Sequence, residues 1–421
     1  MSRRPRAAIV VTGSELVRGE RADRNGPFYA REAFSLGLQP EQIVIVGDEP
    51  GDLEAALRAA SEADVCLVSG GLGPTHDDRT VELVARVAGA PLRIDPALEA
   101  HIEGVSRGVA ERLSRPYADF APGVTKQATL PEGAVVVGIA GTAPGFVLPT
   151  ARCVYVVMPG PPGELRRLWP AAVESEPFQQ VLARTTPPGR RVLRFYGASE
   201  SAVARALAEA GGDGDGVEAT ICARDFEIHV DLVVEPGADA RADELVDALR
   251  EPLRRYLFTE DERPIAELVL DLCRARGFRL ATAESCTGGL VAARLTDVPG
   301  ASDVLTGAIV AYANEVKTGE LGVPAALIAK HGAVSAEVAA AMAAGVRERL
   351  GVDVGIAVTG IAGPDGGTPE KPVGLVHCHV SAPDGGKGHE LSLPGDRDTI
   401  RSRATVAALH LARRVLELAS E

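Results

Sequence analysis

The amino-acid sequence predicts an α/β protein built from more than one domain. Apolar, strand-like segments alternate with amphipathic, helix-like segments from Ala7 onward, as in a mostly parallel sheet covered by helices. The chain has 421 residues, which is long for one hydrophobic core. Segments rich in proline, glycine and charge interrupt the alternation near residues 169–191 and 259–264. Together these observations indicate two or three domains.

Local hydrophobic periodicity predicts each element in turn. In the first part we expect strands at 7–11, 42–46 and 64–69 and helices at 25–36 and 51–60. In the middle part we expect a strand at 192–196, a helix at 199–210 and a strand at 227–234. In the last part we expect strands at 279–282, 308–311 and 353–358 and a helix at 398–418. The predicted domains are 1–172, 173–258 and 259–421.

The overall charge and the cysteines limit the classes of function. The formal net charge is −14 and no basic cluster stands out, so we expect no nucleic-acid partner. The six cysteines form no C-x-x-C pair, which is typical of reduced thiols in a cytoplasmic protein. The apolar run at 7–11 is too short for a signal peptide, and no stretch is long enough to span a bilayer. We therefore expect a cytoplasmic protein without a membrane partner.

A glycine-rich segment after the third expected strand points to a phosphate site. Residues 70–78 read G-G-L-G-P-T-H-D-D, where glycines allow close approach of a phosphate and Asp77 or Asp78 can hold a divalent metal. A single aspartate here is better explained as a helix cap. Other polar residues and glycine-proline loops follow further strands, namely Glu15, Asp23, Asn25, Asp48, 141–145 and 159–164. The whole set favours a magnesium-type phosphate site.

The segment 283–289, A-E-S-C-T-G-G, offers a nucleophile at an expected strand-to-helix turn. Backbone N–H groups at such a turn lack helical partners and can face an anion or oxyanion. Both Ser285 and Cys286 are candidate nucleophiles. Cys286 would need a thiolate-stabilising partner, and the candidates His331, His377 and His379 are distant in sequence.

Ser285 needs a base, and Lys317 is the candidate among only five lysines. It follows the strand expected at 308–311, and a desolvated lysine can act as the base of a Ser-Lys pair. Tyr312 could share in proton transfer. The alternative is a surface lysine at a helix start. The loop 359–367 resembles a phosphate or ribose cradle, to which Arg401 or Arg403 could add charge.

These strings together resemble the CinA (competence/damage-inducible) family. In the first domain they are G-S-E-L at 13–16, Asn25, G-D at 47–48, 70–78, 141–146 and 159–164. In the last domain they are A-E-S-C-T-G-G, Y-x-N-x-x-K, H-G-A-V-S, T-G-I-A-G-P-D-G-G and K-P-V-G. The resemblance implies a MoCF-like (molybdopterin-binding type) α/β domain, a small KH-like α+β middle domain and a C-terminal α/β deamidase domain. Asp213 and Asp215 beside the middle domain's G-x-x-G favour a structural role there.

For the first domain the resemblance implies hydrolysis of ADP-ribose to AMP and ribose 5-phosphate with a divalent metal. The metal ligands would be Asp48 and Asp78. The substrate-contacting residues would be Glu15, Asn25, Gly71, Gly73, Thr75, Thr142 and Pro161.

For the last domain it implies deamidation of nicotinamide mononucleotide (NMN) without a cofactor. Ser285 would be the nucleophile, Lys317 the base and Tyr312 its assistant. The substrate-contacting residues would be Thr287, Gly288, Gly289, Asn314, Thr359, Gly360, Gly363 and Arg403. A homodimer is also implied. The competing hypothesis is a non-catalytic protein, either associated with competence and DNA repair or binding molybdopterin.

Overall fold

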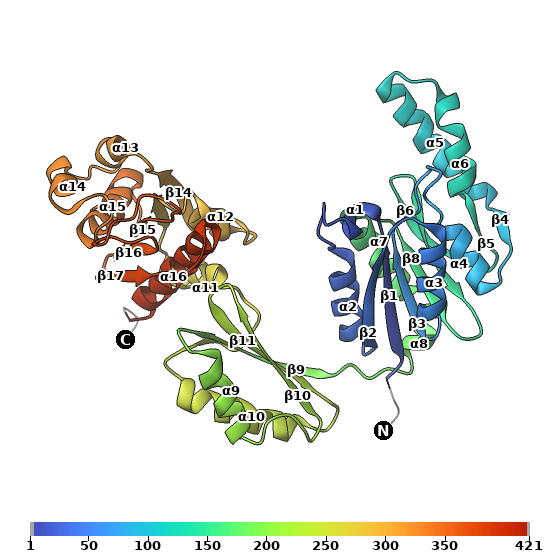
Figure 1. The fold of residues 1–421 in the computed structure, drawn as a ribbon, viewed down its shortest axis with the longest axis horizontal. Coiled ribbons are helices and arrows are strands. Elements are labelled where there is room, and N and C mark those ends of the chain that lie inside the picture. Colours follow the sequence, from blue (N-terminus) through green and yellow to red (C-terminus); the bar gives the residue numbers. More distant parts are fainter. Residues whose placement is uncertain (1–3, 419–421) are drawn as a thin grey trace. The chain divides into compact units, whose positions relative to one another are not determined.

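The computed structural model describes residues 4–418. They form two compact units, and the boundary along the chain falls between Pro188 and Gly189. In the first unit, four parallel strands follow the order β2 (Gln39–Val46), β1 (Arg6–Thr12), β3 (Val65–Ser69) and β8 (Val154–Met158). The sheet continues with antiparallel β7 (Ala143–Pro149) and β6 (Val135–Ala140). The expected, mostly parallel α/β sheet is confirmed (Figure 1).

Helices cover both faces of this sheet because side chains along the strands alternate between two cores. Ile9 and Val11 pack with α2 (Asn25–Ser35), α7 (Pro162–Glu174) and α8 (Glu176–Leu182), whereas Ala8 and Val10 pack with α3 (Pro50–Ala60) and α4 (Thr80–Ala88). The remaining elements of this unit are α1 (Ser14–Val17), α5 (Pro96–Leu113), α6 (Ala121–Gln127), β4 (Leu92–Ile94) and β5 (Thr129–Pro131).

The first unit extends beyond residue 172, where the sequence-based boundary was placed. That position lies inside α7, and α8 follows with Phe178 and Val181 buried in the same core. The predicted break at 169–191 therefore lies C-terminal to α8. The polar and proline-containing start of α8 concealed its amphipathic face.

The second unit begins with the middle domain, an antiparallel sheet with two helices. The strand order is β10 (Val217–Arg224), β11 (Glu227–Val234), β9 (Gly189–Tyr196) and β12 (Leu257–Thr259). The helices α9 (Glu200–Glu209) and α10 (Asp239–Leu253) pack on one core with these strands. The α+β character expected of this segment is thus observed.

The C-terminal domain has a five-stranded sheet in the order β14 (Leu305–Val310), β13 (Leu280–Glu284), β15 (Val354–Gly360), β16 (Leu375–Ala382) and β17 (Gly385–Ser392). The first three strands are parallel and the last two are antiparallel. One face packs against α11 (Ile265–Arg276), α12 (Leu290–Thr296) and α16 (Arg397–Leu418). The other packs against α15 (Ala336–Leu350), beside the short α13 (Asn314–Gly319) and α14 (Ala325–His331).

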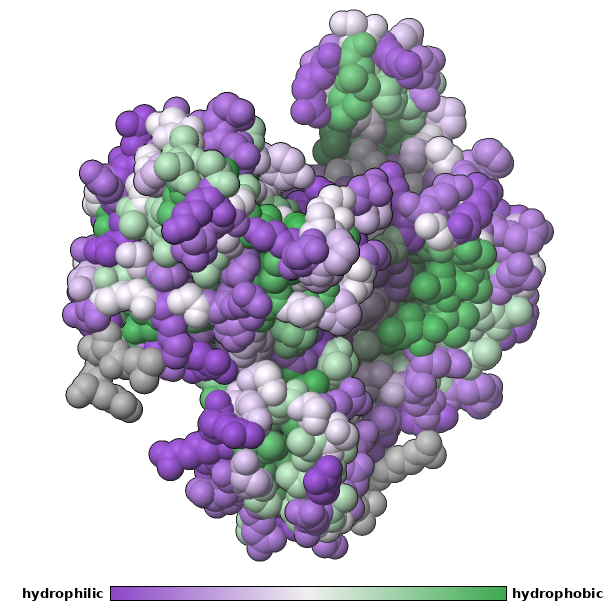
Figure 2. Space-filling view, turned by 60° about the vertical axis from the view of Figure 1, so that its left-hand side comes forward, coloured by the Kyte–Doolittle hydropathy of each residue, from purple (hydrophilic) through white to green (hydrophobic). Residues whose placement is uncertain are grey.

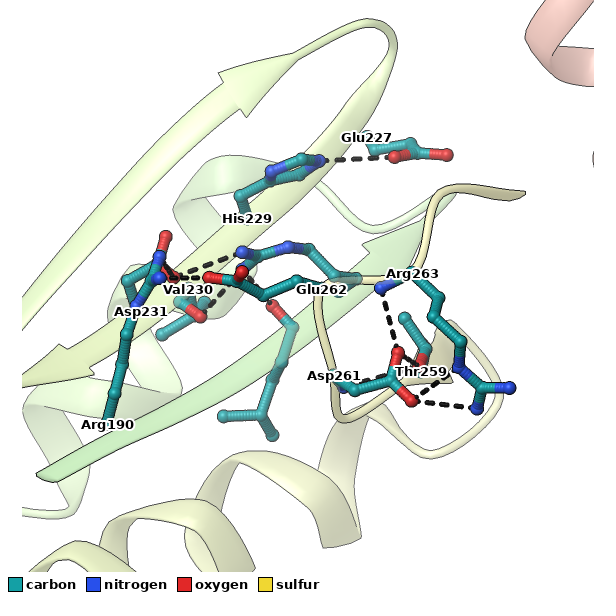
Figure 3. A network of polar contacts seen from close by, with 11 residues as sticks. Arg190, Glu227, His229, Val230, Asp231, Thr259, Asp261, Glu262 and Arg263 are labelled. Atoms are coloured by element: carbon teal, nitrogen blue, oxygen red, sulfur yellow. Dashed lines mark hydrogen bonds and ion pairs between the residues drawn. The ribbon is translucent and has the colours of Figure 1, made fainter. Parts of the chain in front are cut away.

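A polar network joins the middle domain to the C-terminal domain (Figure 3). Asp231 accepts from Arg190 at 2.7 Å and from Arg194 at 3.0 Å, and Arg190 also pairs with Glu262. Asp261 binds the Thr259 hydroxyl at 2.7 Å and the Arg263 Nε at 2.8 Å. The second predicted break is therefore an ordered connection.

The surface carries apolar residues among hydrophilic ones (Figure 2). Val17, Ile43 and Ile45 are exposed large hydrophobic residues, the last two on the edge strand β2. Within residues 4–418, no helix has the length and apolar character needed to cross a membrane. The six cysteines carry free thiols, and all except Cys222 are buried.

Candidate functional site

The predicted nucleophile loop follows β13 and enters α12, as the sequence indicated. The buried carboxylate of Glu284 fixes its conformation by accepting the Thr287 hydroxyl at 2.7 Å and the Gly289 amide at 2.9 Å. It also accepts from Thr282 Oγ1, Val291 N and Ala292 N. A carboxylate at a helix N-terminus satisfies amides that the helix leaves unpaired. Thr287 therefore uses its hydroxyl to hold the loop and does not present it to a ligand.

Ser285 and Lys317 lie together in the interior of the C-terminal domain. The Lys317 Nζ donates to Ser285 Oγ at 3.1 Å, and also to the carbonyls of Ala311 at 2.8 Å and Tyr312 at 3.1 Å. Lys317 is 1% exposed and Ser285 is 8% exposed. Burial lowers the pKa of Lys317, because desolvation disfavours the charged ammonium. Lys317 is thus no surface lysine.

Arg401, on α16, holds the other side of the nucleophile loop. Its Nε donates to the Cys286 carbonyl at 3.1 Å and its Nη2 to the Thr287 carbonyl at 3.0 Å. Gly288 and Gly289 turn the chain with φ values of 64° and 99°, which favour glycine. The backbone N–H groups of Cys286 and Thr287 face the Cys286 sulfur, where they act to lower the pKa of the thiol against the larger effect of burial. Arg401 and the glycine pair therefore fix a turn whose first two N–H groups are directed at the thiol.

Cys286 lies in a different environment from Ser285. Its side chain packs into the apolar core, and burial raises the pKa of its thiol to about 11. His331 pairs with Glu337 at 3.0 Å, and His377 lies 3.8 Å from Glu390. No described histidine forms a hydrogen bond with the Cys286 sulfur. The geometry favours Ser285 as the nucleophile.

Tyr312 differs from the sequence-based expectation. Only its backbone carbonyl contacts Lys317, whereas its hydroxyl accepts from Arg397 Nη2 at 2.9 Å. Tyr312 as a whole is 61% exposed. Arg397 also donates to the Gly363 carbonyl at 2.7 Å. Arg397 thus links Tyr312 to Gly363, and the Tyr312 hydroxyl bonds Arg397 and not the Lys317 Nζ.

The other predicted residues of this domain lie in varied positions. Asn314 is exposed at the start of α13, and the buried Thr359 hydroxyl donates to the Ala333 carbonyl at 2.9 Å. At Gly360, an added Cβ atom would lie 2.9 Å from the Leu375 carbonyl oxygen, which is too close. Glycine at this position therefore allows the neighbouring strand to pack closely. Arg403 lies away from the loop, donating to the Pro394 carbonyl at 2.7 Å and covering the Phe226 ring. Arg401 therefore contacts the loop in place of Arg403.

A cavity of about 670 Å³ lies at the carboxyl edge of the first domain's sheet, where α/β folds place ligands. Six predicted residues line it: Glu15, Asn25, Asp48, Gly71, Asp78 and Pro161. Asp23 and Asp77 line it as well. Gly73 lines a second cavity of about 470 Å³. Thr75 and Thr142 are not among the residues that line either cavity.

Hydrogen bonds hold the polar residues of this cavity in place. Asp48 accepts the Ser14 hydroxyl at 2.6 Å and the Ser14 amide at 3.0 Å. Asp78 accepts from both the amide and the hydroxyl of Thr75. The Asn25 amide group donates to Ser69 Oγ at 2.8 Å and to the Gly160 carbonyl at 2.7 Å. Within residues 4–418, no three His, Cys, Asp or Glu side chains gather as a metal-holding set.

The fold and the sites define a protein with two α/β domains of different kinds. The first has a polar cavity at the carboxyl edge of its sheet, and the C-terminal one has a buried Ser-Lys pair. Comparisons with known proteins agree with this division. The model described as "Probable molybdopterin binding domain" matches residues 8–178, and the one described as "CinA C-terminal domain" matches residues 262–416.

Curated relatives match along nearly the whole chain. The CinA-like protein of Mycolicibacterium gilvum is 44% identical over 422 residues, which cover 98% of each chain. That of Mycobacterium tuberculosis is 45% identical over 421 residues, covering 98% of this chain and 97% of the relative. The crystal structure of competence/damage inducible protein CihA from Agrobacterium tumefaciens is 38% identical with a TM-score of 0.35, covering 38% of this chain and 99% of that one. The chain belongs to the CinA family.

Proposed function

We propose that the C-terminal domain is an amidohydrolase that converts NMN to nicotinic acid mononucleotide and ammonia. The observation that carries this proposal is the 3.1 Å contact between the buried Lys317 Nζ and Ser285 Oγ. A lysine without its proton can remove the proton of a serine hydroxyl and so produce a nucleophile for acyl transfer. The resemblance to NMN deamidases supports NMN as the carboxamide substrate.

The contacts of Lys317 explain how it would receive the proton. A neutral amine has two N–H donors and one lone pair, and the carbonyls of Ala311 and Tyr312 accept those two donors. The lone pair then faces Ser285 Oγ. Buried placement lowers the pKa of Lys317, which increases the fraction of the neutral base.

The reaction would proceed through an acyl-enzyme. Ser285 Oγ attacks the carboxamide carbon as its proton passes to Lys317, and the carbonyl oxygen takes up the negative charge of the tetrahedral intermediate. Lys317 then protonates the leaving nitrogen, and the C–N bond breaks to release ammonia. Water attacks the nicotinoyl ester, and its proton returns through Lys317 to Ser285.

A direct experiment separates the two candidate nucleophiles. Ammonia and nicotinic acid mononucleotide would be measured with purified native chain, Ser285→Ala and Cys286→Ala. We expect Ser285→Ala to abolish turnover and Cys286→Ala to retain most of it. An active Ser285→Ala variant would refute the proposed mechanism, and a native chain that binds NMN without turnover would favour a binding role.

For the first domain we propose metal-dependent hydrolysis of ADP-ribose to AMP and ribose 5-phosphate. Asp48 and Asp78 line one cavity and keep free lone pairs, which fits Mg²⁺ because this ion often binds one or two carboxylates plus substrate phosphates. When bound, the ion would neutralise pyrophosphate charge. Asn25 and Glu15 would orient the substrate.

The matching molybdopterin-binding model favours a second candidate for this cavity, namely binding of molybdopterin without hydrolysis. Incubating the native chain with ADP-ribose and Mg²⁺ and measuring AMP would decide between them. Asp48→Asn should abolish AMP release, with Ser285→Ala as a control that retains it. Tight molybdopterin binding without AMP release would support the second candidate.

A further inference from the structure

A strongly basic hollow lies within the second unit, where the middle domain meets the C-terminal domain. Its volume is about 330 Å³, and it is lined by Arg254, Arg255, Leu257, Lys387, Arg413, Arg414 and Glu417. Five of these seven residues are basic and one is acidic. In a chain with a net charge of −14, such a local excess of positive charge calls for a specific explanation.

Three separate segments build this basic hollow. Arg254 and Arg255 follow α10, Lys387 belongs to β17, and Arg413 and Arg414 lie near the end of α16. Like charges repel at short distance, so bringing them together costs free energy unless an anion compensates. The convergence depends on the packing of two domains and is invisible in the sequence.

The protein itself supplies little compensation. Glu417 accepts from Arg413 Nη1 with both oxygens at 2.7 Å, so the single carboxylate is already engaged. Within residues 4–418, Arg254, Lys387 and Arg414 form no salt bridge. Arg413 is 7% exposed, and its Nε is buried without a hydrogen-bond partner. Because the Arg413 Nε is closed to solvent, an anion in the hollow would be bound by the more exposed Arg254, Lys387 and Arg414.

An adjoining cavity of about 1010 Å³ shares Arg414 with the basic hollow. Its lining includes the aromatic rings of Tyr196, Phe226 and Tyr256. Phe226 is 42% exposed, and the Arg403 guanidinium lies 5.4 Å from its ring centroid. Exposed aromatic and guanidinium planes are surfaces on which a nucleobase can stack.

We propose that the basic hollow and the adjoining cavity bind a nucleotide with at least two phosphate groups. The phosphates would lie among Lys387, Arg254 and Arg414, and the base would lie against Phe226. The basic residues surround one small hollow and do not form a stripe along the surface, which favours a small nucleotide over nucleic acid. This site is separate from both proposed catalytic sites.

The test measures binding of ADP and of inorganic pyrophosphate to the full chain by calorimetry. Lys387→Glu and Arg254→Glu reverse exposed charges at the hollow, and Lys330→Glu makes the matched change on α14. We expect either hollow variant to weaken both ligands at least about tenfold, and Lys330→Glu to leave them unchanged. Phe226→Ala should weaken ADP but not pyrophosphate.

The difference in affinity between the native chain and either hollow variant reports on this site and not on the first domain's cavity, because Lys387 and Arg254 belong to the second unit. An unchanged thermal unfolding midpoint verifies folding. The proposal is overturned if the native chain binds neither ligand, or if Lys387→Glu and Arg254→Glu bind both as tightly as Lys330→Glu does. Tighter, Lys387-dependent binding of a single-stranded oligonucleotide would replace it with a nucleic-acid site.

Discussion

Replacing Lys317 with methionine would test the base directly. Methionine keeps much of the aliphatic volume of Lys317 and removes the Nζ that contacts Ser285 Oγ at 3.1 Å. A positioned general base typically contributes about 10²–10⁴ in rate. We therefore expect kcat for NMN deamidation to fall by at least about 10², because Ser285 Oγ would keep its proton.

The pH dependence of the native chain carries the same information. Lys317 must lose its proton before it can act, so kcat/KM should rise with pH and level off below the ordinary lysine value of 10.5. Each unit by which burial lowers the Lys317 pKa raises the neutral fraction at pH 7 about tenfold. The rising limb should disappear in the Lys317→Met variant.

The assay is steady-state release of ammonia from NMN between pH 6 and pH 10. Lys330→Met provides the matched control, because Lys330 is exposed on α14. A Lys317→Met variant that is folded and retains the native rate would refute the assignment of the base. So would a native profile that falls as pH rises through this range.

Three further predictions concern the nucleophile loop and the buried contact between His410 of α16 and Glu227 of the middle domain, in which His410 Nε2 lies 2.7 Å from Glu227 Oε1. Cys286 should react slowly with iodoacetamide at neutral pH, because burial raises the pKa of its thiol to about 11. Glu284→Gln should lower the free energy of unfolding by about 1–3 kcal/mol in denaturant titrations, because an amide cannot accept all five hydrogen bonds of the buried carboxylate. Global stability should fall as pH drops from 6.5 to 4, by up to about 3 kcal/mol. The cause is His410, whose pKa burial lowers to about 4, so the unfolded chain binds a proton there that the folded chain does not. Unfolding curves with equal midpoints at both pH values would contradict this.

The nucleophile loop could be predicted from sequence because its signals are local. A five-residue strand with a short apolar start, a glycine pair and a helix follow one another within residues 280–296. The start of the edge strand β2 was harder to predict. Its first residues, Gln39 to Gln42, are mostly polar and mostly exposed, so the predicted strand begins only at residue 42. Edge strands carry a weaker hydrophobic pattern because one side faces solvent.

Long-range partners of the site could not be predicted in the same way. Arg401 lies 115 residues from Cys286, and nothing in its neighbourhood distinguishes it from Arg403 until α16 packs on the nucleophile loop. The Tyr312 hydroxyl turns toward Arg397, which is 85 residues away. The local turn and the family resemblance therefore proposed Ser285 and Lys317 as nucleophile and base. The choice among arginines and the direction of the Tyr312 phenol depend on tertiary packing.

The central claim is that Ser285 forms an ester with the nicotinoyl group of NMN. Acid quenching of the native chain during turnover, followed by peptide mass mapping, tests it most directly. The account predicts that the peptide containing Ser285 carries the nicotinoyl group with its ribosyl 5′-phosphate still attached, with the Ser285 side chain as the modified position. The same group on Cys286, or turnover by Ser285→Ala, would contradict it.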